Sequence, residues 1–450
     1  MLAAGDIEWI FRGTVIKPHS RRSVDICEDQ LIVVDKKGYI AHSAPAGGAE
    51  SAVVLDLVEK GEVAKDRFVE LGADGWLLPG FVDTHTESRI DRDPNGLGKR
   101  VYARLVQRLL QNGTTAASVF GTISVEANLV LAQAFLDAGI RGQIGKVAMD
   151  QHSIPTYIET TSSSLSATRT FIERMRALDA ASQPLVEPVI TPRFVPTCSL
   201  ELLRGLADLA RETGARVQSH MCESEGMVAV CREMLGGKSD VEVLDELGLL
   251  HDRSLMAHCT HSSAPDLALL ARTGTSIAHC PLSNIYFSAE RQLPLREAWD
   301  AGVRVGLGSD ISGGYRVGLD ENMRWAVGVS RLREGRRAEV RVGGKEEKSK
   351  SLAISWKEAI YLATLGGAQA LGLDRDARRV GTLDVGAAFD AQWIEVGGPA
   401  SRVDWFDLED EEGGEGRRVT TEEKVEKWWS NGSEVDRKAV WVQGRRVYSQ

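Results

Sequence analysis

The stretch LPGFVDTHTE, at residues 78–87, decides how this chain folds. An apolar run that ends in Asp-x-His-x-His lets a parallel strand present two imidazoles to one metal ion, because side chains two positions apart on a strand point the same way. Here the first of these positions holds His85, and the second holds Glu87 instead of a histidine. The stretch therefore predicts a buried strand that leads into a metal site with a replaced second ligand.

Other short apolar runs end in the same kinds of residue. They are VQSHMCE at 217–223 with His220 and Glu223, LMAH at 255–258 with His258, and VRVGLGSD at 303–310 with Asp310. In a parallel α/β barrel the carboxyl ends of the strands converge on one mouth, where active sites are built. Imidazoles and a carboxylate suit zinc, with one position left open for water. A single strand-end histidine is more often structural than a ligand, but the order of these runs favours one shared site.

The composition is that of a globular enzyme. The 450 residues leave room for one large barrel and a smaller unit, and 43% of them are hydrophobic. A net charge of −10 argues against a nucleic-acid partner, which requires clustered positive charge. No apolar run approaches the roughly 20 residues of a membrane helix, and no signal peptide is apparent. Six cysteines without paired spacing predict free thiols and a cytoplasmic protein.

Strand-like and helix-like segments alternate along most of the chain. Strands are predicted at 7–15, 30–35, 391–396 and 440–447, and amphipathic helices at, for example, 199–213 and 265–273. This βα rhythm between the two ends is typical of a parallel barrel. Two charged stretches interrupt it. We interpret residues 331–350 as a surface insertion and 409–415 as a solvated acidic loop.

With these runs in place, the chain resembles the guanine deaminase family of the amidohydrolase superfamily over nearly its whole length. The Pro-Gly strand at 79–80 and the Gly-x-Asp turn at 308–310 are shared by many amidohydrolases. More specific to guanine deaminases are TPRF at 191–194, Ser-His-x-x-Glu at 219–223 and Asp-x-x-Gly-Gly at 310–314. The resemblance implies hydrolysis of guanine to xanthine and ammonia, one zinc ion per chain and a homodimer.

The resemblance also implies a fold. It is a (β/α)8 TIM-like barrel of class α/β at residues 78–374, beside a small β-sandwich. The sandwich is formed by the N-terminal segment 1–77 and the C-terminal segment 375–450. We expect the two ends of the chain to lie together next to the barrel.

The resemblance further implies roles for individual residues. His85, His220 and Asp310 would bind zinc, and Asp310 would also accept a proton from its water. His220 and Asp310 would lie against the substrate. Glu223 would carry protons to the ring nitrogen and to the departing ammonia, and His258 would stabilise the tetrahedral intermediate. Arg193 and Phe194 would hold the purine by hydrogen bonds and by ring contact.

The chain departs from the family directly after His85. The family continues with the second histidine and a loop that carries a glutamine, whereas residues 87–100 are polar, punctuated by Gly and Pro, and short, which predicts a loop. Either a coding segment is missing from this sequence, or Glu87 binds the metal or the site is inactive. Glutamate can bind zinc through oxygen, but it adds a negative charge. We expect the chain to fold but to deaminate guanine more slowly than a form with the histidine and loop restored.

Two other functions remain open. The chain could be another deaminase or amide hydrolase of the superfamily, against which Arg193 and Phe194 argue. It could also be a non-catalytic relative that keeps the fold. A substrate panel distinguishes the first, and metal analysis distinguishes the second.

Overall fold

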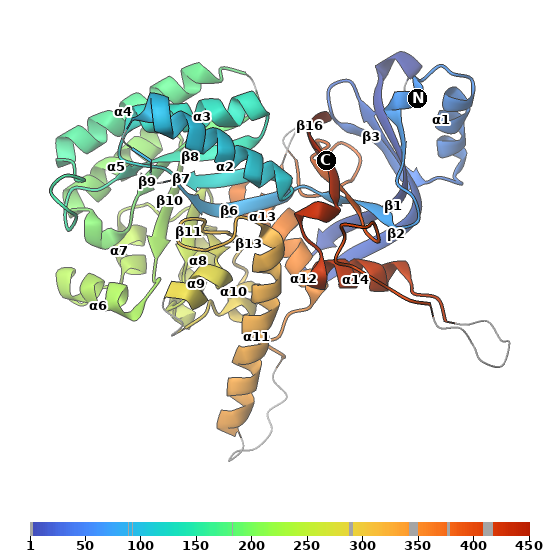
Figure 1. The fold of residues 1–450 in the computed structure, drawn as a ribbon. Coiled ribbons are helices and arrows are strands. Elements are labelled where there is room, and N and C mark those ends of the chain that lie inside the picture. Colours follow the sequence, from blue (N-terminus) through green and yellow to red (C-terminus); the bar gives the residue numbers. More distant parts are fainter. Residues whose placement is uncertain are drawn as a thin grey trace.

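Two parts make up the molecule in the computed structural model: a barrel wrapped by helices, and a sheet built from both ends of the chain (Figure 1). The structure describes residues 3–88, 90–91, 93–181, 183–287, 291–341, 350–375, 379–407 and 417–450. Among the described helices, none combines the length and the apolar character that a membrane crossing requires. All six cysteines are free thiols.

The barrel consists of eight parallel strands that lie beside one another in chain order. They are β6 (Phe81–Glu87), β7 (Thr114–Phe120), β8 (Arg141–Ala148), β9 (Val186–Pro192), β10 (Arg216–Met221), β11 (Ser254–His258), β12 (Ser276–His279) and β13 (Val305–Leu307). The last strand returns to the first, where the Asp310 N–H donates to the His85 carbonyl at 2.8 Å. Ser309 N–H also donates to the buried carboxylate of Asp83 at 2.9 Å. The predicted (β/α)8 architecture is confirmed.

Helices cover the outside of the barrel and of the terminal sheet (Figure 1). They are α1 (Ala49–Glu59), α2 (Lys99–Gln111), α3 (Val125–Ala138), α4 (Thr161–Leu178), α5 (Leu200–Thr213), α6 (Glu225–Met234), α7 (Asp240–Glu246), α8 (Ala264–Thr273), α9 (Pro281–Phe287), α10 (Leu295–Ala301), α11 (Leu319–Arg341), α12 (Trp356–Tyr361), α13 (Gly367–Leu371) and α14 (Thr421–Asn431). The predicted helices at 199–213 and 265–273 are α5 and α8. In α5 the Ser199 hydroxyl accepts from the Leu202 N–H, and Gly214 ends the helix in a left-handed conformation, as N- and C-caps do.

The second part is one sheet that combines strands from both chain ends. Its order is β16-β15-β14-β5-β1-β2-β3, with β4 paired to β1. The bounds are β1 (Ile7–Ser20), β2 (Ser23–Asp35), β3 (Ile40–Pro45), β4 (Phe68–Glu70), β5 (Gly75–Pro79), β14 (Ala391–Glu395), β15 (Arg437–Val442) and β16 (Arg445–Ser449). Phe11 stacks on Phe389 at 4.9 Å and meets Trp441 edge-on at 5.1 Å, so both ends share one core. The expected union of the chain ends is confirmed.

One predicted terminal strand is wrong in its extent. Residues 440–447 belong to two antiparallel strands, β15 and β16, rather than to one. Gln443 and Gly444 separate them with φ angles of 46° and 72°. Two consecutive residues with positive φ are what a type I′ hairpin turn requires, so the chain reverses there.

The decisive stretch at 78–87 is also not a single strand. Strand β5 ends at Pro79 in the terminal sheet, and β6 begins at Phe81 in the barrel. Gly80 lies between them, where a Cβ atom would come within 2.1 Å of the Thr115 hydroxyl. Its N–H donates to the Asp390 carbonyl at 2.9 Å. Only glycine fits this close approach, so Gly80 marks the crossing from one part to the other.

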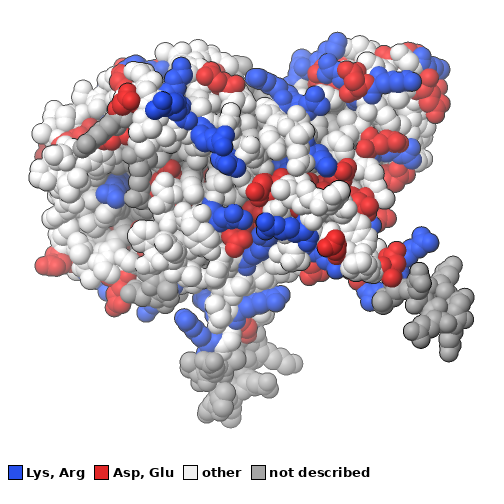
Figure 2. Space-filling view, viewed as in Figure 1, with Lys and Arg blue, Asp and Glu red and all other residues white. Residues whose placement is uncertain are grey.

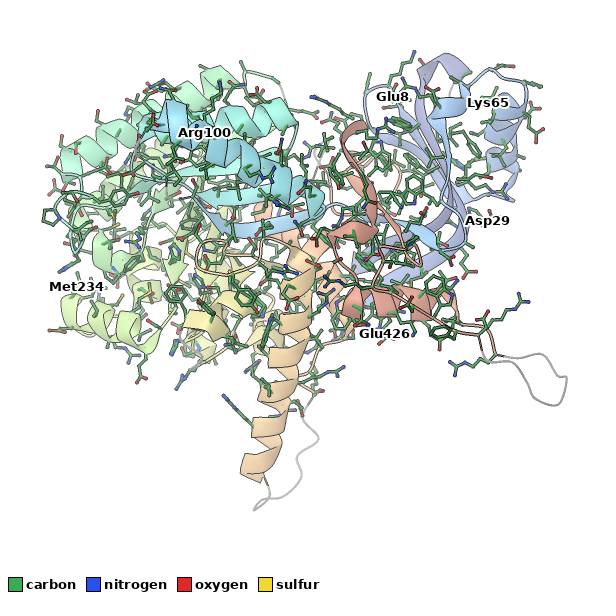
Figure 3. The ribbon with its side chains drawn as sticks, viewed as in Figure 1. Glu8, Asp29, Lys65, Arg100, Met234 and Glu426 are labelled. Atoms are coloured by element: carbon green, nitrogen blue, oxygen red, sulfur yellow. The ribbon has the colours of Figure 1, made fainter. Side chains whose placement is uncertain are left out.

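The two charged stretches differ from the expectation. Residues 331–341 continue helix α11, which projects from the body of the molecule (Figure 1), so the start of the predicted insertion is helical. Residues 342–349 and 409–415 lie outside the described residues. On the face shown in Figure 2, acidic and basic side chains are interspersed. Arg100 on α2 and Glu426 on α14 are exposed on the outer helices (Figure 3).

Candidate active site

Five candidate side chains meet at the mouth where the barrel strands end. His85 lies on β6, His220 on β10 and His258 at the end of β11, while Glu223 follows β10 and Asp310 follows β13. The three histidines and the aspartate are buried. Because parallel strands point in one direction, their carboxyl ends bring residues from distant parts of the chain to one place.

The backbone is strained at two of these strand ends. His258 has a φ angle of 74° and Asp310 one of 48°. Residues other than glycine seldom adopt positive φ, because the side chain crowds the backbone. Such conformations concentrate at functional sites, where the surrounding structure imposes them. The strain therefore supports a functional role for this mouth.

The side chains form a compact cluster of nitrogen and oxygen donors. His85 Nε2 lies 3.1 Å from Asp310 Oδ1, and His220 Nε2 lies 3.3 Å from Glu87 Oε1. Potential ligand atoms fall within 4.8 Å of one another in two sets, one of His85, His220 and His258, and one of His85, Glu87 and Asp310. His85 belongs to both sets. The trio predicted as zinc ligands is thus divided between them, with His85 in common.

Hydrogen bonds orient two of the imidazoles. His220 Nδ1–H donates to the Arg193 carbonyl at 2.8 Å, which turns Nε2 toward the cluster. Asn284 Nδ2 donates to His258 Nδ1 at 3.0 Å, so the neutral ring of His258 carries its proton on Nε2. Metal-binding histidines commonly donate their second ring nitrogen to a carbonyl or carboxylate in this way. His220 has the arrangement of a ligand, whereas His258 presents a hydrogen-bond donor.

The donor set fits a divalent metal ion. His85 Nδ1 has no hydrogen-bond partner among the described residues, although the side chain is fully buried, and His85 Nε2 lies 3.1 Å from Asp310 Oδ1. Burying a polar group without a hydrogen-bond partner costs free energy, unless another group such as a metal ion interacts with it. Burial alone would lower the pKa of His220, but its hydrogen bond and charge interaction with Glu87, and then the charge of Glu223, raise that pKa to about 9. The cluster therefore favours positive charge at its centre.

The neighbouring ionisable groups have distinct protonation states. Burial lowers the pKa of His258, so its ring is neutral at pH 7. Burial would raise the pKa of Asp310, but the charge of and hydrogen bond with His85 lower it overall, so the carboxylate is ionised. Glu223 Oε1 lies 3.5 Å from His258 Nε2. The mouth thus offers neutral His258 as a hydrogen-bond donor and ionised Asp310 as an acceptor, with the side chain of Glu223 beside them.

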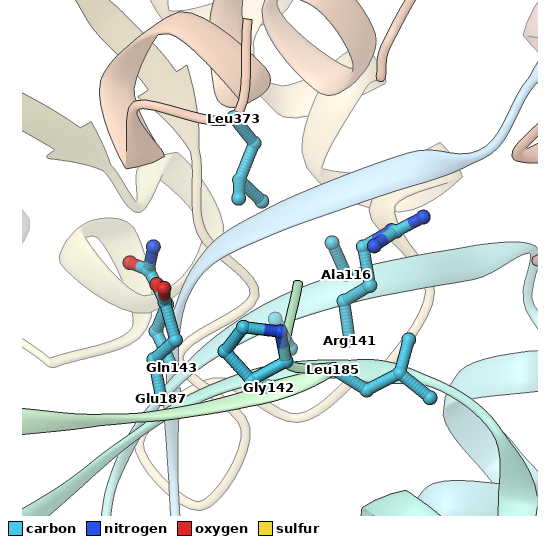
Figure 4. A pocket seen from close by; sticks show the side chains of 9 residues that line it. Ala116, Arg141, Gly142, Gln143, Leu185, Glu187 and Leu373 are labelled. Atoms are coloured by element: carbon cyan, nitrogen blue, oxygen red, sulfur yellow. The ribbon is translucent and has the colours of Figure 1, made fainter. Parts of the chain in front are cut away.

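Two connected chambers open at the cluster. The smaller has a volume of about 120 Å³ and is lined by Glu87, Arg193, Phe194, His220, Glu223, Phe287, Asp310 and Gly313. The larger, of about 370 Å³, shares Glu87, Arg193 and His220 with it and extends toward Asp91 and Tyr157. Figure 4 shows a different pocket, where β7 to β9 begin, whose volume of about 10 Å³ holds no more than one water molecule.

The structure brings together every residue that the sequence predicted for the site. These are His85, Arg193, Phe194, His220, Glu223, His258 and Asp310. The Arg193 guanidinium lies 5.2 Å from the centre of the Phe194 ring, and both line the smaller chamber. The bridge at 87–100 is only partly a loop. Asp93 accepts from two backbone N–H groups of a helical turn at Pro94–Gly98 that leads into α2.

Several supporting residues were not assigned a role from the sequence. Ser283 donates a short hydrogen bond to Asp310, and its neighbour Asn284 holds His258. Both lie at the start of α9 (Pro281–Phe287), soon after β12 ends at His279, and this position is a signal that could have found them. Phe120 packs edge-on against His85 with a ring distance of 4.5 Å. Its position at the end of an apolar strand carries no comparable signal.

Comparison with known proteins agrees with this geometry. The model of the Amidohydrolase family matches residues 76–447. A guanine deaminase of Dictyostelium discoideum is 30% identical over 478 aligned positions, covering 99% of this chain and all of the relative. The human guanine deaminase is 32% identical over 97% of this chain and 96% of its own. The Dictyostelium alignment is longer than the 450 residues here, so that relative contains segments that this chain lacks.

A solved structure has the same fold over nearly the whole chain. The guanine deaminase of C. acetobutylicum, with guanine bound in its active site, superimposes with a TM-score of 0.80 and 26% identity. The match covers 98% of this chain and 100% of that one. The barrel, the convergent donor cluster and these full-length matches lead to one conclusion: this chain is a member of the amidohydrolase family.

Proposed function

We propose that this protein catalyses the zinc-dependent hydrolysis of guanine to xanthine and ammonia. The observation that carries the proposal is the smaller chamber. There Arg193 and Phe194, which suit a flat heterocycle with hydrogen-bond acceptors, lie beside Glu223 and the donor cluster. The full-length relatives are guanine deaminases, and the solved neighbour holds guanine in its active site.

His85, His220 and Asp310 would hold one zinc ion per chain. Imidazole nitrogen and carboxylate oxygen are the ligands that zinc accepts in catalytic sites. When bound there, zinc lowers the pKa of a bound water to about 7 and so supplies a nucleophile at neutral pH. Ser283 donates to Asp310 and keeps that carboxylate oriented toward His85.

The protein side chains would then move the protons of the reaction. Arg193 donates to acceptors of the purine, and Phe194 contacts its ring. As a C–O bond forms at the amino-bearing carbon, Glu223 takes one proton of the water and delivers it to the ring nitrogen. Asp310 accepts the second proton of that water, and this proton then passes through Glu223 to the amine. The C–N bond breaks, and ammonia leaves. The Nε2–H of neutral His258 donates to the oxygen of the tetrahedral intermediate.

The proposal predicts a narrow substrate range. Protein reconstituted with zinc should release xanthine and ammonia from guanine, and should not act on adenine or cytosine. Removal of zinc with a chelator should stop the reaction, and its return should restore it. Product analysis by chromatography measures this. Faster release of ammonia from another ring amine would refute the choice of substrate, and a folded protein that binds no zinc would indicate a non-catalytic relative.

The larger chamber supports the expectation of slow turnover. It opens beside Glu87, where the chain is short, and gives the site a volume of about 370 Å³ next to the smaller chamber. A neighbouring chamber large enough to admit water weakens the electrostatic stabilisation that a closed site provides. Restoring the histidine and the loop should therefore increase kcat.

A second prediction concerns Arg193. The Arg193→Met variant should raise KM for guanine about 10- to 100-fold, because one charge-assisted hydrogen bond of about 1.5 to 3 kcal/mol is lost. The effect should fall mainly on KM, since this contact holds the substrate as firmly before the reaction as during it. Arg193→Lys keeps the charge but not the planar fork, and should recover only part of the loss. Steady-state kinetics measure both variants, and an unchanged KM would remove Arg193 from the purine site.

The homodimer and the cytoplasmic location are further proposals that rest on the resemblance and on the unpaired cysteines. Sedimentation of the purified protein measures the first. A monomer at working concentrations would contradict it.

A further inference from the structure

Glu87 occupies the position at which the strand would offer a second metal ligand. It ends β6, two residues after His85, so both side chains leave the strand on the same side. Its Oε1 lies 3.3 Å from His220 Nε2. Together with His85 and Asp310 it forms a set whose ligand atoms all lie within 4.8 Å of one another. The carboxylate thus reaches the same centre as the two imidazoles.

Backbone hydrogen bonds of Glu87 and of the following residue anchor the end of β6 to two neighbouring segments. Its N–H donates at 3.2 Å to the carbonyl of Ile311, which directly follows Asp310. The N–H of Ser88 donates at 2.8 Å to the carbonyl of Phe120 at the end of the neighbouring strand. The side chain is 12% exposed. The strand end is therefore anchored between β7 and the segment after β13, so the carboxylate is positioned by the barrel and not by a loose loop.

The electrostatics at this point favour a cation between the carboxylate and the imidazoles. Two carboxylates, Glu87 and Asp310, face two imidazoles over short distances. A divalent ion would balance both negative charges. It would also meet a ring nitrogen of the fully buried His85, whose Nδ1 has no hydrogen-bond partner among the described residues.

We propose that Glu87 is itself a ligand of the catalytic metal. The full set is then His85, Glu87, His220 and Asp310, two imidazoles and two carboxylates. This inference rests on the metal site of the proposed function and deepens it. Carboxylate oxygens suit manganese as well as zinc, whereas imidazole-rich sites favour zinc and its neighbours. Manganese should therefore compete with zinc better in this protein than in a variant that carries histidine at this position.

Metal affinity tests the proposal without reference to turnover. Full-length protein is compared with Glu87→Gln, which keeps the size of the side chain but removes its charge and ligand strength. Zinc affinity is measured by competition with a chelator, and metal content by elemental analysis. Loss of the ligand should weaken zinc binding by at least about 10-fold, the lower limit seen when even supporting residues around a metal are removed. The matched control is Asp91→Asn, which removes a carboxylate of the adjoining chamber and should leave the affinity unchanged.

A second variant keeps the test decisive if Glu87→Gln does not fold. Glu87→His supplies a nitrogen in place of the oxygen. It should bind zinc tightly, lose affinity for manganese relative to zinc, and change the visible spectrum of the cobalt-substituted protein. Equal zinc affinity in wild type and Glu87→Gln, or identical cobalt spectra in wild type and Glu87→His, would overturn the proposal. Guanine turnover is scored separately: tight zinc binding that depends on Glu87, without deamination, would refute the proposed reaction and leave this inference standing.

Discussion

Glu223→Gln is expected to lower kcat for guanine about 100- to 10,000-fold, the usual contribution of a positioned proton-transfer group. Glu223 lines the smaller chamber, and its Oε1 lies 3.5 Å from His258 Nε2. It belongs to neither of the two sets of close ligand atoms. Glutamine has the same shape but cannot carry a proton between water, ring nitrogen and amine. The chemical step should suffer while metal binding persists.

The measurement pairs kcat with metal content and with the pH profile. Bound zinc should stay at the wild-type level in Glu223→Gln, and kcat should fall across the whole pH range. Asp91→Asn serves as the control, since it removes a carboxylate at the edge of the larger chamber without touching the cluster. If Glu223→Gln retained more than a tenth of the wild-type kcat, a different group would have to transfer the protons. If it lost its zinc, Glu223 would belong to the metal site instead.

Asp390→Ala should destabilise the protein by about 3 to 5 kcal/mol, the range found when one partner of a buried ion pair is removed. Arg141 on β8 donates to both oxygens of Asp390, at 2.8 and 3.1 Å. Their side chains are 5% and 0% exposed. Burial would lower the pKa of Arg141, but the charge of Asp390 raises it overall, so the guanidinium stays charged. Without Asp390 it would be a buried charge without its counterion.

The Arg141–Asp390 pair joins the barrel to the terminal sheet, which adds to the loss of stability expected for Asp390→Ala. The Gln443 N–H also donates to Asp390 at 2.8 Å, at the turn between β15 and β16. Urea unfolding followed by circular dichroism measures the effect, with Glu212→Ala as the control. Glu212 pairs with Arg169 on the surface, where removing one partner costs only about 0 to 1 kcal/mol. A similar loss in the free energy of unfolding in both variants would show that the buried ion pair stabilises the protein no more than the surface pair does.

Much of the fold could be predicted from the sequence, because burial leaves a local periodic signal. Apolar runs punctuated by turn residues marked the barrel strands, and the amphipathic pattern marked helices such as α5 (Leu200–Thr213). The convergence of the candidate site residues was predictable for a related reason. His85, His220, His258 and Asp310 each end such a run, and parallel strands bring their ends together.

The predictions from sequence were wrong where a strand changes its pairing partner while its hydrophobic pattern continues. Apolar residues continue through Gly80, yet the chain leaves the terminal sheet there and enters the barrel. The same holds for Gln443 and Gly444, where an apparently continuous strand reverses. Hydrophobic periodicity reports which side of a strand is buried. It does not report which neighbour the strand pairs with.

The residue types at the candidate metal site, including Glu87 where the family has a histidine, follow from the order of amino acids. Whether that carboxylate reaches the centre does not, because it depends on how β6 is anchored between β7 and the segment after β13. The pairing of Arg141 with Asp390, 249 positions apart, likewise exists only once the barrel meets the terminal sheet. Local interactions reveal each strand and helix, but a buried polar group finds its partner through contacts between distant segments. Only the closed fold brings those segments within a few ångströms of each other.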